Sequence, residues 1–128
     1  MQLRVPGPTP CPPEVLQAMS KQMINHRGKE FGEIIQQVTS RLKEVFQTKG
    51  DVFILTSSGT GAMEAAIVNS LSPGDKVLSL SNGVFGDRFA TIAERFGAEV
   101  TRLHFEWGQA VDPDAAKDAL ESDPTIKE

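Results

Sequence analysis

The chain has 128 residues, of which 13 are basic and 17 acidic, and its formal net charge is −4. A negative charge without a basic stripe argues against a nucleic-acid partner, and no apolar run is long enough for a membrane span or a signal peptide. We therefore expect a cytoplasmic protein, in agreement with a single cysteine, Cys11, that can form no internal disulfide.

The first 50 residues predict two helices. Pro12 and Pro13 suit a helix start, and the apolar residues that follow recur at helical spacing as far as Met23. A polar break at 25–30 precedes a second and longer helical pattern, which we expect to end at Gly50. Its apolar face consists of Phe31, Ile34, Ile35, Val38, Leu42, Val45 and Phe46.

From residue 52 onward the sequence alternates between strand and helix patterns. VFILT at 52–56 is typical of a strand buried on both faces, and KVLSL at 76–80 and AEVTRL at 98–103 predict two further strands. SPGD at 72–75 predicts a turn, and Asp112 predicts the cap of a last helix. The alternation favours an α/β fold with a mainly parallel sheet and helices on its faces.

A serine- and glycine-rich loop, SSGTG at 57–61, leads from the first of these strands into a helix. The first turn of a helix has N–H groups without intrahelical acceptors and carries the positive end of the helix dipole, so it can bind an anion. No lysine follows the loop, which excludes a P-loop, and a dinucleotide fits poorly because Glu64 replaces the third glycine of that motif. Two interpretations remain for Ser58, Gly59 and Thr60: they hold a single phosphate, or they merely cap the helix.

A second loop, NGVFG at 82–86, follows the second strand and contains Phe85 between two glycines. Ligands of parallel α/β sheets bind at the carboxyl ends of the strands, where both loops are expected. The ring of Phe85 can lie flat on a planar ligand whose phosphate is held by the first loop. The alternative is that Phe85 plugs the end of the core. We expect Asp87 to cap the helix that follows.

Four segments occur in order along the chain: PGPTPCPPEVLQAM, NHRGKEF, SSGTGAMEAA and NGVFGDR. Together they resemble the N-terminal part of class V aminotransferases, nearest to the alanine–glyoxylate and serine–glyoxylate branch. The resemblance implies the N-terminal part of the large domain of a fold type I transferase that depends on pyridoxal 5'-phosphate, incomplete in this chain. It implies a homodimeric enzyme that moves an amino group from alanine or serine to a 2-oxo acid such as glyoxylate. The expected division is an N-terminal segment with a helix (1–24), an interface helix region (25–50) and the start of the cofactor-binding domain (51–128).

The resemblance also implies roles for individual residues. Ser58, Gly59 and Thr60 would form the phosphate cup, with the backbone N–H groups of Gly59 and Thr60 as the main donors. Phe85 would stack on the pyridine ring, and Gly7 would line the substrate pocket. No metal ligand is implied.

The resemblance also places four further residues. His26 and Arg27 would lie near a subunit interface, although a helix-terminus histidine and a surface cation explain them equally well. His104 and Trp107 would cover the end of the third strand, without a chemical role.

The family's Schiff-base lysine, its acid at the pyridine nitrogen and its arginine for the substrate carboxylate come from sequence beyond residue 128. We therefore assign no catalytic residue within the chain and expect the chain alone to be inactive. One alternative is another class V enzyme such as a cysteine desulfurase, against which Phe85 argues mildly because those enzymes carry histidine at this position. The other is a non-catalytic module that binds a phosphorylated ligand.

Overall fold

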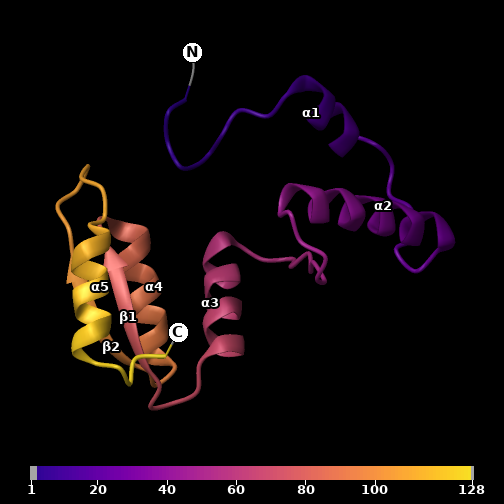
Figure 1. The fold of residues 1–128 in the computed structure, drawn as a ribbon. Coiled ribbons are helices and arrows are strands. Elements are labelled where there is room, and N and C mark those ends of the chain that lie inside the picture. The colour runs from indigo at the N-terminus through magenta and orange to yellow at the C-terminus, as the bar shows by residue number, and fades with distance from the viewer. Residues whose placement is uncertain (1–2, 128) are drawn as a thin grey trace. The chain divides into compact units, whose positions relative to one another are not determined.

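The computed structural model describes residues 3–127, and these form two compact units that divide between Ile54 and Leu55. The first unit contains helices α1 (Pro13–Met19) and α2 (Lys29–Val45). The second contains α3 (Gly59–Ser70), β1 (Lys76–Ser81), α4 (Val84–Arg95), β2 (Glu99–His104) and α5 (Pro113–Ser122), as Figure 1 shows.

Helix α1 begins as its sequence predicts and ends earlier. Pro12 is the N-cap and Pro13 the first helical residue, where a missing N–H costs nothing. The helix ends at Met19, so the prediction that it extends to Met23 was wrong. Ser20 is the C-cap, and its hydroxyl donates to the carbonyl of Gln17 at 2.8 Å, a local bond that competes with continuation of the helix.

Helix α2 ends in a Schellman motif rather than at Gly50. Gln47 adopts the left-handed conformation, with φ of 52°, directly after the C-cap residue Phe46. The N–H of Gln47 donates to the carbonyl of Glu44 at 3.2 Å, and the N–H of Thr48 donates to that of Lys43 at 3.0 Å. These two bonds satisfy carbonyls that a helix end leaves free, so the helix stops before the glycine that was predicted to end it.

The second unit is built around a parallel pair of strands. β1 pairs with β2 in a register that sets Lys76 opposite Glu99 and Ser81 opposite His104. The predicted turn before β1 is present, because the N–H of Ser72 donates to Asp75 Oδ2 at 2.8 Å. The last helix begins as predicted, with the Asp112 carboxylate accepting an N–H from the first turn. These elements confirm the predicted α/β alternation.

Helices lie on both faces of this strand pair. β1 pairs with β2 along one edge, and at its other edge Lys76 forms a parallel bridge with Ile126. After β2 the chain therefore passes across β1 to place Ile126 at that second edge. Right-handed crossovers in opposite directions put α4 and α5 on opposite faces of the sheet. Figure 1 accordingly shows β1 between α4 and α5. The small core of the unit consists of Ile67, Ala90 and Ala93.

The segment predicted as the first strand, 52–56, forms no strand. A strand exists only through hydrogen bonds to a neighbour, and within residues 3–127 the sheet consists of β1 and β2, with one isolated bridge from Ile126. The side chains of Phe53, Ile54 and Leu55 are correspondingly exposed, and Phe53 is 81% exposed. The apolar pattern of the segment predicted a strand, but the pairing that makes a strand is not local.

Within residues 3–127, each helix is too short or too polar to cross a membrane.

Candidate functional site

The loop at 57–61 starts helix α3 as the sequence predicts. Ser58 is the N-cap, with extended backbone angles, and its Oγ accepts the N–H of Gly61 at 3.3 Å. Gly59 and Thr60 are the first two helical residues, so their N–H groups have no intrahelical acceptor. A side chain placed on Gly59 would meet no atom within 4 Å, and the backbone here is open to close approach by a ligand. The helix start therefore offers an anion two free backbone donors.

Ser57 adds a hydroxyl that the sequence analysis did not assign. A Cβ added to Gly61 would overlap Ser57 Oγ, so the serine side chain lies directly against the first turn of α3. A larger residue at position 61 would require the Ser57 hydroxyl to move. Hydroxyl groups of Ser57, Ser58 and Thr60 thus lie at the helix start, and each can donate a hydrogen bond to an anion.

Phe85 lies in the first turn of helix α4 and not in a loop, which corrects the prediction from the glycine spacing. Gly83 is the N-cap of α4, so the connection after β1 is only two residues long. Gly86 lies inside the helix, where a Cβ would come within 2.7 Å of Ser81 Oγ. The second glycine of the motif is therefore explained by packing between β1 and α4. Phe85 is 55% exposed, which leaves ring surface accessible to a ligand.

Arg88 connects the two predicted parts of the site. Its guanidinium Nη1 donates to Thr60 Oγ1 at 3.0 Å, and its Cζ lies 5.3 Å from the centre of the Phe85 ring. Phe85 and Arg88 are three residues apart on α4 and therefore share a helix face. The prediction that the two loops face the same edge is consistent with this contact. Sequence reasoning missed Arg88, although its helical spacing from Phe85 was a usable signal.

Asp87 does not cap α4, contrary to the prediction, because the helix begins three residues before it. Its Oδ1 lies 3.5 Å from Nδ1 of His104, the last residue of β2. This carboxylate oxygen is buried and has no hydrogen-bond partner in the described part of the chain. Trp107, in the turn after β2, is 73% exposed.

Three other residues named from the sequence lie in the first unit. Gly7 precedes a cis peptide bond to Pro8 and has open space where a side chain would be. His26 and Arg27 lie in the turn before α2, where the N–H of Arg27 donates to Asn25 Oδ1 at 3.0 Å. They belong to a different unit from Ser58, Gly59, Thr60 and Phe85.

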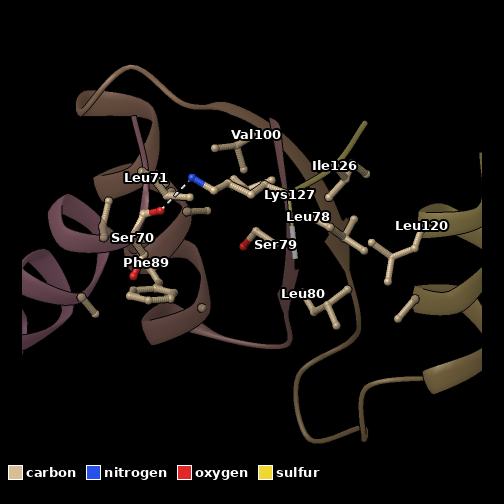
Figure 2. Close-up of a pocket in the computed structure, with 17 residues that line it drawn as sticks. Ser70, Leu71, Leu78, Ser79, Leu80, Phe89, Val100, Leu120, Ile126 and Lys127 are labelled. Atoms are coloured by element: carbon tan, nitrogen blue, oxygen red, sulfur yellow. Dashed lines mark hydrogen bonds between the residues drawn. The ribbon is translucent and has the colours of Figure 1, made fainter. Parts of the chain in front are cut away.

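A cavity of about 640 Å³ in the second unit lies apart from these residues. Aliphatic side chains dominate its lining, and Figure 2 shows Leu78 and Leu80 of β1 facing Leu120 of α5 across it. The ammonium of Lys127 at its edge donates to the Ser70 carbonyl at 3.1 Å and to Asp75. Because its charged group is already paired and its walls are apolar, we assign this cavity no polar ligand.

The clearest pKa shifts also belong to ion pairs outside the candidate site. Arg102 holds the pKa of the Glu94 carboxyl below its usual value through a bidentate hydrogen bond, and Lys127 does the same for Asp75. Thr125 and Lys76 lower the pKa of Asp123 to about 2. The partners of all three carboxylates lie outside the candidate site, so the shifted pKa values do not locate that site.

Free N–H groups at a helix start, a neighbouring aromatic ring and an arginine between them define an α/β domain suited to a phosphorylated ligand with a planar ring. Comparison with known families matches residues 2–126 to the family Aminotransferase class-V. The chain belongs to this family, as the four sequence segments predicted.

Individual relatives support the same conclusion. The chain is 45% identical over 125 residues to an uncharacterised aminotransferase of Methanocaldococcus jannaschii, covering 98% of this chain and 32% of the relative. It is 38% identical to serine–glyoxylate aminotransferase of Methylorubrum extorquens, over 94% of this chain and 30% of that enzyme. Among solved structures, alanine–glyoxylate aminotransferase of Nostoc sp. superposes with a TM-score of 0.85 at 36% identity, over 91% of this chain and 31% of that one. The chain thus spans about a third of the length of the relatives that it matches.

Proposed function

We propose that these residues supply the phosphate and ring contacts of a pyridoxal 5'-phosphate site in an aminotransferase. The observation that carries the proposal is the helix start of α3, where the N–H groups of Gly59 and Thr60 are free and Arg88 joins Thr60 to Phe85. The phosphate would accept hydrogen bonds from these two N–H groups and from the hydroxyl of Ser58. The exposed ring surface of Phe85 would stack on the pyridine.

The proposed reaction transfers an amino group from a small amino acid, alanine or serine, to a 2-oxo acid such as glyoxylate. The donor leaves as a 2-oxo acid and the acceptor leaves as an amino acid, so no external oxidant or reductant is consumed. Pyridoxal phosphate, when bound, carries the amino group between the two substrates and accepts the electrons of the bond broken at the α-carbon. Residues 58–60 and Phe85 would hold it in place, while Gly7 would border the substrate.

The amino donors proposed here are those in the names of the serine–glyoxylate and alanine–glyoxylate enzymes that the chain resembles. We further propose a homodimeric, cytoplasmic enzyme whose cofactor-binding lysine lies outside these 128 residues, in line with relatives about three times as long. Size-exclusion chromatography with light scattering tests the dimer. A monomer that binds one cofactor per chain would refute the proposed dimer.

The first experiment measures the intact mass of the natural polypeptide after incubation with pyridoxal phosphate and reduction with borohydride. We expect a mass well above 13.9 kDa, the mass of these residues, with one cofactor covalently attached. A mass of 13.9 kDa without a specific adduct would contradict the proposal and favour a non-catalytic phosphate-binding module.

A second experiment tests the placement of the phosphate with a matched pair of variants at one position. Thr60→Pro removes the backbone N–H in the first helical turn, where proline is tolerated, and Thr60→Val removes the hydroxyl but keeps the N–H. We expect the proline variant to lose more cofactor affinity than the valine variant, by roughly tenfold if one charge-assisted hydrogen bond is lost. Equal affinities would show that the phosphate does not bind at this N–H.

A further inference from the structure

In the part of the chain that the structure describes, the guanidinium of Arg88 contacts two groups, and neither is a carboxylate. Its hydrogen bond to Thr60 Oγ1 is 3.0 Å long, and its distance from the Phe85 ring centre, 5.3 Å, is within the range of a cation–π contact. Among residues 3–127 no carboxylate oxygen lies within 4 Å of it. Most other arginine and lysine contacts in this unit are ion pairs, as Arg102 with Glu94 illustrates. The position of the Arg88 guanidinium is therefore set by Thr60 and Phe85, the two residues proposed to contact the cofactor.

These two contacts join elements that are distant in sequence. Thr60 is in the first turn of α3 and Arg88 is 28 residues later on α4. The planar guanidinium has five N–H donors in a fixed arrangement, so one donor can bond to a hydroxyl while the flat face lies on an aromatic ring. A single side chain thereby fixes where a hydroxyl of the phosphate cup lies relative to the stacking ring.

We propose that Arg88 is a positioning residue that couples the phosphate end of the cofactor site to its ring end. It acts by holding the Thr60 hydroxyl and the Phe85 ring at one separation, and the inference rests on the proposed function because it takes these two residues as cofactor contacts. A ligand that carries both a phosphate and an aromatic ring gains from this arrangement, since the two contacts are already aligned when it arrives.

The test compares cofactor binding by Arg88→Met, Arg88→Lys and the wild-type natural polypeptide, with dissociation constants from absorbance titration of the apoprotein. Methionine has a similar length but neither charge nor donors. Lysine keeps the charge without the planar donor set. Arg95→Met is the matched control, because Arg95 is an exposed arginine at the other end of the same helix. Far-UV circular dichroism and thermal midpoints check that each variant is folded.

We expect Arg88→Met to weaken pyridoxal phosphate binding about three- to tenfold, from the loss of one hydrogen bond and one exposed cation–π contact. Arg88→Lys should lose less, and Arg95→Met should match the wild type. Binding of pyridoxal, which lacks the phosphate, should also weaken in Arg88→Met because the ring of Phe85 is released. In the double variant with Thr60→Val, the loss should be smaller than the product of the two single losses.

Two results would overturn the inference while leaving the proposed function standing. One is wild-type affinity in Arg88→Met. The other is that Arg88→Met weakens binding of pyridoxal phosphate but not of pyridoxal, and that the double variant with Thr60→Val shows the full product of the two single losses in affinity. That result would make Arg88 a direct phosphate ligand instead of a positioning residue. If the wild-type polypeptide itself binds no pyridoxal phosphate, the proposed function fails and this inference fails with it.

Discussion

Replacing Gly86 with alanine tests whether close packing between β1 and α4 fixes the helix turn that carries Phe85. A Cβ at this position would lie 2.7 Å from Ser81 Oγ, 2.9 Å from its Cβ and 3.0 Å from its Cα. Ser81 is only 4% exposed and is the last residue of β1. The hydroxyl can rotate away from an added methyl group, but the Cα belongs to a paired strand and cannot move alone.

Two opposing contributions set the size of the effect. Alanine is favoured over glycine inside a helix by up to about 1 kcal/mol. Inserting a methyl group into a packed contact costs about 1–3 kcal/mol, and a cost in the upper part of this range is expected where backbone atoms are involved. The net prediction is a loss of about 1–2 kcal/mol in the free energy of unfolding. This loss lowers the thermal midpoint of unfolding relative to the wild type.

The assay is thermal and urea unfolding followed by circular dichroism, with Gly59→Ala as the control. Gly59 also lies in a first helical turn of this unit, but a Cβ there would meet nothing within 4 Å, so its stability should be unchanged or slightly raised. If Gly86→Ala proves as stable as Gly59→Ala, the contact with Ser81 does not fix the start of α4. The glycine would then need another explanation.

Two further predictions concern capping and pH. Ser58→Ala removes the hydroxyl that caps α3 and should lower stability by about 1 kcal/mol in the same unfolding assay, whereas Ser58→Thr should retain most of it. Hydrogen bonds from Thr125 and Lys76 lower the pKa of Asp123 to about 2 in the folded state. The contribution of Asp123 to stability is therefore complete above its pKa in the unfolded state, near 3.8, and is lost as the pH falls from 3.8 to about 2. The stability advantage of the wild type over Asp123→Asn should therefore shrink over this pH range in melting curves, and an advantage that stays constant from pH 5 to pH 2 would contradict the assignment.

Local signals in the sequence were sufficient for much of the second unit. The turn at 72–75 and the Asp112 cap were predicted because a serine or an aspartate forms the key hydrogen bond of each within three residues of itself. The start of α3 at Ser58 was predictable for the same reason. Such features depend on neighbours in sequence, so a single sequence contains the information that they need.

The wrong predictions depend on contacts with distant residues or on backbone geometry that residue type indicates only weakly. The segment 52–56 has the composition of a strand, but no composition supplies a partner for its hydrogen bonds. Gly83 and Gly86 suggested a loop, whereas the first is an N-cap and the second makes room for Ser81. At the end of α2, Gln47 takes the left-handed conformation that glycine usually provides, so Gly50 was the wrong signal.

The same distinction explains which residues of the candidate site the sequence indicated and which it did not. Ser58, Gly59 and Thr60 could be named from sequence because a helix start binds anions through its own backbone. Arg88 was missed because its role consists of a bond to a residue 28 positions away. In a site at the junction of two helices, the hydrogen-bond donors can therefore be predicted from the local sequence, but the residue that aligns them cannot. In such sites, the side chain most worth testing by mutation is the one whose contacts come from different elements.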